Sequence, residues 1–254
     1  AMDRRGIRDQ FDIIYLSDHG HSSVRLGTTL GEYLDRANRN GLDIPSLVTA
    51  SDFIYPNPED RKPSLDEITQ LVGWLQRQPW TGAIFAADEQ VAALPGVFPL
   101  SLVWGTTDER APLLAVSPTW SDEINEFGTP GVVEAMTENA AKRSSHGSAS
   151  PYELHAIAAF NGPSFVSGQT SDIPAGGIDI APTVQAILGA QPSEWMDGRV
   201  IWEVFDKPRG EPGNVTDEVI EPRTRTSNGF EPRLRIHRVG EQTYLHAAEN
   251  GNGT

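Results

Sequence analysis

The chain has 254 residues, 38% of them hydrophobic, which is enough for one large core or two smaller ones. Its formal net charge is −15, from 20 basic and 35 acidic residues. This charge argues against a nucleic acid polymer as partner, because a groove for DNA or RNA is basic. Cysteine is absent, so any metal must be held by Asp, Glu, His or neutral oxygen ligands. No window of about 18 apolar residues occurs, and the sequence therefore predicts no membrane span.

The first predicted element is the apolar run Phe11 to Leu16, which ends at Ser17-Asp-His-Gly20. Such a run is typical of a strand buried on both faces, as in a parallel sheet covered by helices. At its carboxyl end, Asp18 and His19 would reach the sheet edge where α/β proteins bind ligands. A carboxylate beside an imidazole suits a divalent metal such as zinc. The alternative for this tetrapeptide alone is a solvated Asp and a capping His.

Helix and strand signals then alternate along the chain. A helix is expected within Leu26 to Asn38, and a β-rich segment spans Ser46 to Pro56. Ser64-Leu-Asp-Glu67 is a capping box that begins a second helix. Gly82 to Ala86 predicts a short buried strand after that helix.

The middle of the chain is less regular. Two β-like runs, Leu100 to Trp104 and Leu113 to Val116, are separated by a polar turn at Gly105 to Arg110. A weak helix is expected near Val132 to Lys142.

A second His-Gly pair lies in the segment Ser144 to Pro151, where His146 and Gly147 precede the apolar run Leu154 to Phe160. That run predicts another buried strand. The same pair of residue types thus occurs twice, far apart in the sequence, beside a predicted strand each time.

The last strong helix signal is Ile178 to Gly189, with Asp179 placed to cap it, Pro182 in its first turn and Gly189 at its end. The tripeptide Asp197-Gly-Arg199 follows as a turn.

Composition divides the chain into residues 1–206 and residues 207–254. The second part begins with a linker, Lys207 to Asn214, that is rich in Pro, Gly and charge. Leu234 to Val239 and Thr243 to His246 then alternate on either side of Gly240, as in a short β-hairpin extension.

Three motifs in this order resemble the alkaline phosphatase superfamily, and most closely its type I phosphodiesterase and nucleotide pyrophosphatase-like branch. They are Ser17-Asp-His-Gly20, His146-Gly-Ser, and the helix that begins D-I-A-P-T at Asp179 and is followed by D-G-R. The resemblance runs from about Phe11 to Ile201. It implies an α/β fold, with a largely parallel sheet flanked by helices, in the C-terminal portion of an alkaline phosphatase-like domain over residues 1–206.

The resemblance also implies a chemistry. In that family two metal ions, usually zinc, clamp a phosphate ester for attack by a Ser or Thr. Asp18 and His19 would bind one ion and His146 the other. His21 would lie behind these ligands or beside the substrate. The implied substrate is a small anionic phosphate ester, either a diester, a pyrophosphate or a monoester.

The sequence departs from the family at its beginning. The family places its nucleophile and further ligands well upstream of this motif, whereas 17 residues precede Asp18. Two clamped metals take about six ligands, of which the motifs supply three. We therefore expect a fragment of a larger enzyme, with its nucleophile upstream, which alone is inactive and lacks tightly held metal. Its uncovered sheet edge would favour self-association.

Two other interpretations remain open at this stage. One is a non-catalytic scaffold or pseudoenzyme of the same fold. The other is a sulfatase or phosphonate hydrolase, because the same two-metal frame serves related esters. The resemblance slightly favours a location outside the cytoplasm.

Overall fold

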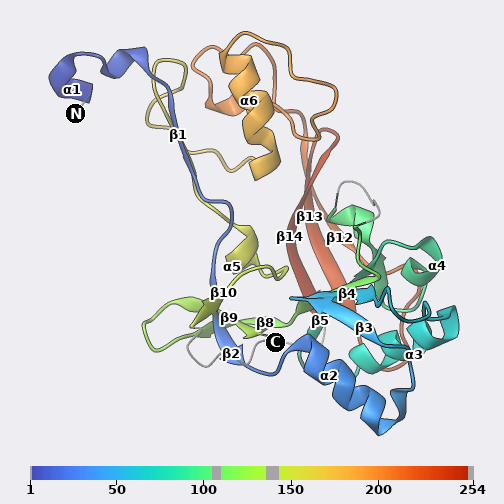
Figure 1. The fold of residues 1–254 in the computed structure, drawn as a ribbon. Helices are drawn as coiled ribbons and strands as arrows, with labels where there is room; N and C mark the ends of the chain where they lie inside the picture. The colour runs from blue at the N-terminus through green and yellow to red at the C-terminus, as the bar shows by residue number, and fades with distance from the viewer. Residues whose placement is uncertain (1, 105–109, 136–142, 251–254) are drawn as a thin grey trace. The chain divides into compact units, whose positions relative to one another are not determined.

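The computed structural model describes residues 2–104, 110–135 and 143–250 (Figure 1). The chain forms two compact units. Unit 1 comprises Ala1–His19, His155–Glu218 and Ile236–Tyr244, and unit 2 comprises Gly20–Leu154, Val219–Arg235 and Leu245–Thr254. Unit 1 is therefore built from three separate stretches, and most of unit 2 is one stretch inserted between the first two of them.

The α-helices are α1 (Met2–Arg5), α2 (Leu30–Ala37), α3 (Leu65–Leu75), α4 (Glu89–Ala92), α5 (Pro151–Leu154) and α6 (Ile180–Ile187). Single helical turns of other types occur at Arg8–Gln10, Asn38–Leu42, Leu100–Leu102, Gly177–Asp179 and Trp202–Val204. In the part of the chain that the structure describes, no helix has the length and apolar character needed to cross a membrane.

The strands are β1 (Ile13–Leu16), β2 (Ser22–Leu26), β3 (Leu47–Ala50), β4 (Phe53–Pro56), β5 (Thr81–Ala86), β6 (Val97–Pro99), β7 (Leu114–Pro118), β8 (Trp120–Ile124), β9 (Pro130–Ala135), β10 (Ser144–Ser145), β11 (Ala158–Asn161), β12 (Val215–Ile220), β13 (Pro232–Val239) and β14 (Gln242–Asn250). They form sheets in the orders β1-β11, β10-β2-β9-β8, β12-β13-β14 and β3-β4-β7-β5-β6.

The main hydrophobic core lies in unit 2, between the five-stranded sheet and helices α2 and α3. The apolar stripe of α3 is buried through Ile68, Leu71, Val72 and Leu75, and all six residues of β5 are buried. The predicted capping box is confirmed, because the Ser64 hydroxyl accepts from the Glu67 amide and the Glu67 side chain accepts from the Ser64 amide. The predicted strand at Gly82 to Ala86 is confirmed as β5.

The helix expected within Leu26 to Asn38 begins later than its apolar stripe suggests. Residues 23–26 of β2 pair in parallel with residues 132–135 of β9, and this pairing holds the first part of the segment extended. Thr29 then caps α2 by accepting a hydrogen bond from the Glu32 amide.

Unit 1 contains the strand that carries the Ser-Asp-His-Gly element. β1 and β11 run antiparallel, from Ile13 opposite Asn161 to Leu16 opposite Ala158, and lie side by side in Figure 1. The expectation that this strand is buried on both faces is wrong, because Tyr15 is 61% exposed and Leu16 is 49% exposed. The β1-β11 sheet has two strands, so among the described residues no further strand covers its edges.

The fold is α/β, as expected, but its sheets are mixed. The pairs β2-β9 and β5-β6 are parallel, whereas β1-β11, β10-β2, β3-β4, β4-β7, β5-β7 and β8-β9 are antiparallel. The prediction of a largely parallel sheet is therefore wrong for these strands. One reason is the length of the connections. β3 and β4 are joined by residues 51–52, and a two-residue turn can only join antiparallel strands.

Several local predictions are corrected. Leu100–Leu102 is a 3-10 turn after β6, not part of a strand. The run Leu154 to Phe160 is not one buried strand either, because α5 ends at Leu154 and β11 begins at Ala158, with Ile157 76% exposed between them. Residues 132–135 belong to β9 rather than to a helix. The rest of that predicted helix, and most of the predicted turn at 105–110, lie outside the described residues.

The segment in which the sequence predicts a hairpin holds β13 and β14, which are neighbours separated by residues 240–241. Gly240 has a φ of +60°, a conformation that glycine adopts without strain. β12 lies on the other side of β13, and the residues of this sheet are divided between the two units.

Candidate functional site

Strand pairing within unit 2 joins the two His-Gly segments. β10 runs antiparallel to β2, with Ser145 opposite Ser22. The amide N–H of Gly20 donates to the carbonyl oxygen of Glu153 at 2.7 Å. One histidine directly precedes β2 and another directly follows β10. The pairing therefore brings these two histidines to the same end of the strand pair.

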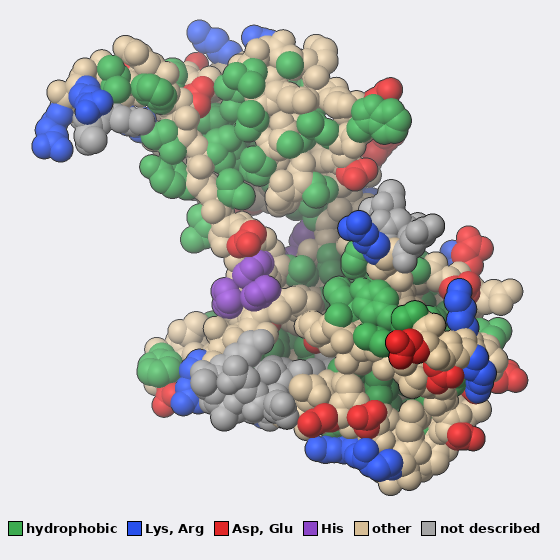
Figure 2. Space-filling view, viewed as in Figure 1, with side chains coloured by type: hydrophobic (Ala, Val, Ile, Leu, Met, Phe, Trp, Pro, Cys, Tyr) green, Lys and Arg blue, Asp and Glu red, His purple; other side chains and the backbone are tan. Residues whose placement is uncertain are grey.

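The two histidines are His21 and His146, and their rings are in contact. Their centroids are 5.2 Å apart, and the ring planes are nearly perpendicular at 80°. Both residues are exposed. Histidine side chains are visible in two places in the view of Figure 2, and the larger of these is a compact group. Each imidazole offers a nitrogen donor, so the pair can bind a borderline cation such as zinc from solvent.

Hydrogen bonds among buried polar groups hold the loop that carries His146. Gly147 has a φ of +109°, a left-handed conformation that favours glycine. The Ser148 amide donates to Oε2 of Glu153 at 2.7 Å, and the Ser150 amide donates to the Ser148 hydroxyl at 3.2 Å. Ser148, Ser150 and Glu153 are all buried. The exposed imidazole thus projects from a well-anchored backbone.

Asp18 and His19 belong to unit 1, where they follow β1 as predicted. Their side chains are neighbours, with Oδ2 of Asp18 3.5 Å from Nε2 of His19. The Ser17 hydroxyl donates to the carbonyl oxygen of His19 at 2.8 Å, which fixes the turn. That these two residues join His146 around a pair of metal ions stays a prediction.

The donor set fits zinc in type but is not complete. Within residues 2–104, 110–135 and 143–250, no group of three or more His, Cys, Asp or Glu side chains is arranged to hold a metal ion. Zinc is ordinarily four-coordinate, with at least three protein ligands. His21 and His146 could therefore supply two of the four ligands of a tetrahedral zinc site.

The D-I-A-P-T motif has a structural role in unit 1. Asp179 was predicted to cap α6, but its side chain makes no hydrogen bond to that helix. It is fully buried and accepts from the Gly176 amide, the Arg199 amide and the Tyr244 hydroxyl, each at 2.8 Å. Burial, and then this hydrogen bond to Asp179, raise the pKa of Tyr244. The carboxylate therefore ties three segments of unit 1 together.

The D-G-R turn completes the same network. The Arg199 guanidinium forms two hydrogen bonds with Glu203, at 2.6 and 2.9 Å, and donates to the carbonyl of Pro174 at 2.8 Å. At Gly198 a Cβ atom would lie 2.2 Å from the carbonyl oxygen of Ile178, so the turn requires glycine. These two motifs thus contribute to the folding of unit 1.

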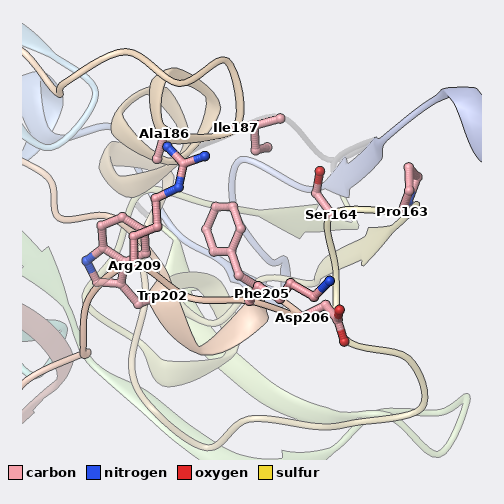
Figure 3. A pocket seen from close by; sticks show the side chains of 9 residues that line it. Pro163, Ser164, Ala186, Ile187, Trp202, Phe205, Asp206 and Arg209 are labelled. Carbon is pink, nitrogen blue, oxygen red and sulfur yellow. The ribbon is translucent and has the colours of Figure 1, made fainter.

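A separate cavity of about 190 Å³ lies in unit 1 (Figure 3). It is lined by Pro163, Ser164, Ala186, Ile187, Trp202, Phe205, Asp206, Lys207 and Arg209. Its one hydroxyl, that of Ser164, donates to Asp12 at 2.7 Å. The Ser164 amide also donates to Asp12, at 3.0 Å, and no histidine is among the nine lining residues. The predicted site residues all lie elsewhere.

Glu153 is the site residue that sequence reasoning missed. A signal for it exists in the order Ser150-Pro151-Tyr152-Glu153. A serine before a proline is a frequent helix start, and an acidic residue three positions on can reach back to the preceding backbone. The structure has α5 there, and the carboxylate reaches back to Ser148.

Comparison with protein-family models, with curated proteins and with solved structures gave no match for this chain.

Proposed function

We propose that this chain is a metal-dependent hydrolase of phosphoric esters, related to the type I phosphodiesterase and nucleotide pyrophosphatase-like branch of the alkaline phosphatase superfamily. The meeting of the two His-Gly segments supports this most strongly. The resemblance requires these segments to converge although they are far apart in sequence. Within unit 2 the rings of His21 and His146 lie 5.2 Å apart, and β10 pairs with β2 directly beside them.

The finer assignment of the fold belongs to the same proposal. The strand that precedes Asp18 pairs with the strand that follows the His-Gly-Ser segment, and α6 with its D-G-R turn lies in the same unit. Strands β1 and β11 and helix α6 are thus parts of unit 1, whereas β2, β10 and α5, which adjoin the two His-Gly segments, are parts of unit 2. On this basis we propose that residues 1–206 belong to an alkaline phosphatase-like α/β domain.

The proposed chemistry follows from charge. A phosphate ester is an anion, and a chain with a net charge of −15 repels it unless cations neutralise it locally. Two divalent ions, when bound, would supply that neutralisation and activate the nucleophile. His146 would hold one ion through an imidazole nitrogen, with His21 beside it. Asp18 and His19 would hold the other. None of these four residues is proposed as the nucleophile.

Metal binding tests the proposal directly. Zinc is added to the full chain while the imidazole signals are followed by NMR. We expect the signals of His21 and His146 to shift together at the lowest zinc concentrations. His146→Ala should weaken zinc binding at least 10-fold, because the remaining imidazole then binds alone. His246→Ala, a change in β14, is the matched control and should leave the affinity unchanged.

Equal zinc affinity in the wild type and in His146→Ala would contradict the proposal and favour a non-catalytic module. If zinc binds as expected, hydrolysis of phosphate and sulfate esters with the same chromogenic leaving group can be compared on the zinc-loaded chain. Faster hydrolysis of the sulfate ester would replace phosphoric esters with sulfuric esters as the substrate class.

We also propose that the β1-β11 sheet mediates self-association. Both strands have an open edge among the described residues, and large apolar side chains are exposed on or beside the sheet. Tyr15 is 61% exposed, Leu16 49% and Ile157 76%. Open edges with apolar side chains pair readily with further strands.

A further inference from the structure

Glu153 carries a buried negative charge for which the described residues provide little compensation. Its side chain is 2% exposed, yet Oε1 has no hydrogen-bond partner and no basic side chain forms an ion pair with the carboxylate among the described residues. Among the residues that the structure describes, the carboxylate accepts one hydrogen bond, from the Ser148 amide to Oε2. A buried carboxylate is costly unless it is paired or fully hydrogen-bonded. Such a group calls for an explanation beyond packing.

Glu153 also connects the two segments that carry the histidine pair. Its side chain holds the amide of Ser148, two residues after His146. Its backbone carbonyl holds the amide of Gly20, one residue before His21, at 2.7 Å. One buried residue therefore bonds to both loops from which the paired imidazoles project.

We propose that Glu153 is a positioning residue for the His21–His146 site, and that its charge compensates a cation bound there. The backbone carbonyl and the carboxylate set the spacing of the two loops. The negative charge of the carboxylate also lowers the free energy of a cation bound by the two imidazoles. Its unbonded Oε1 can accept a hydrogen bond from an N–H group that becomes polarised when the cation binds. Carboxylates behind histidine ligands commonly have this effect on metal affinity. The inference rests on the proposed function, because it requires that the pair binds a cation.

The conservative variant Glu153→Gln separates the charge from the hydrogen bond. Its amide oxygen can still accept from Ser148, so the loop should keep its conformation, but the negative charge is lost. We expect zinc affinity at the histidine pair to fall about 10- to 100-fold. Hydrogen exchange at the Ser148 and Gly20 amides should stay as slow as in the wild type. Glu126→Gln removes an exposed charge from the same unit and is the matched control.

The outcomes distinguish this inference from the function on which it rests. If the wild type binds zinc, His146→Ala weakens binding and Glu153→Gln binds as tightly as the wild type, then Glu153 is merely structural and the inference is wrong. If His146→Ala has no effect, the histidine site itself is wrong. If Glu153→Gln loses zinc affinity together with amide protection, Glu153 acts by holding the loop, and the proposed compensation of the cation by its charge is wrong.

Discussion

The buried carboxylate of Asp179 offers the sharpest test of how unit 1 is held together. Its side chain is fully buried and accepts three hydrogen bonds, from the amides of Gly176 and Arg199 and from the hydroxyl of Tyr244. A hydrogen bond to a charged group contributes about 1.5–3 kcal/mol. In Asp179→Ala all three donors lose this partner, but water can replace part of the loss because Gly176, Arg199 and Tyr244 are only half-buried.

The expected net loss is about 3–5 kcal/mol, because three such hydrogen bonds are lost and water replaces part of them. For a protein of this size that corresponds to a fall in melting temperature on the order of 10 °C. Thermal unfolding followed by circular dichroism measures the shift, and hydrogen exchange locates it, because the Arg199 amide should lose protection first. Asp172→Ala removes an exposed carboxylate nearby in the same unit and should change neither quantity. A melting temperature for Asp179→Ala within about 1 °C of the wild type, with Arg199 still protected, would refute the reasoning.

Two further predictions concern the surface. The Arg61 guanidinium, and then the Ser64 amide, lower the pKa of Glu67 to about 2. Because the folded-state pKa lies below the unfolded value, the ionised carboxylate contributes stability above about pH 4.5, and this contribution is lost as the pH falls toward 2. Glu67→Gln should therefore flatten the acid limb of a plot of stability against pH, and an unchanged limb would contradict the assignment. Ile157→Lys should reduce self-association in sedimentation velocity, since it places a charge beside the open edges of the β1-β11 sheet, and undiminished association would place the contact elsewhere.

Local signals in the sequence identify much of this fold. The capping box at Ser64 and the apolar run of β5 depend on neighbours within a few residues, and both are found as predicted. Signals that depend on distant partners are less informative. The apolar run of β1 fits a strand buried on both faces as well as it fits the observed one, which lies in a two-stranded sheet with exposed side chains. The sequence contains no local feature that distinguishes these environments.

The candidate site shows the same limit. His146 stands out in the sequence because it precedes a glycine, and His21 was placed only behind the ligands or beside the substrate. The contact between the two rings depends on the pairing of β2 with β10, and β10 has two residues, too few to show a periodic pattern. Asp179 was recognised as a helix-start residue, whereas its partners Arg199 and Tyr244 are separated from it in sequence. Long-range hydrogen bonds of this kind leave no spacing pattern along the chain.

The insertion of unit 2 within unit 1 has a consequence for biosynthesis. During translation β1 emerges well before β11, and on an unfolded chain their pairing would have to close a very long loop. If the Gly20–Leu154 stretch folds first, the hydrogen bond from Gly20 to Glu153 brings its two ends together, and the two strands become close neighbours. Unit 1 would then fold only after unit 2. A destabilising mutation confined to unit 2 would therefore also hinder the pairing of β1 with β11 in unit 1.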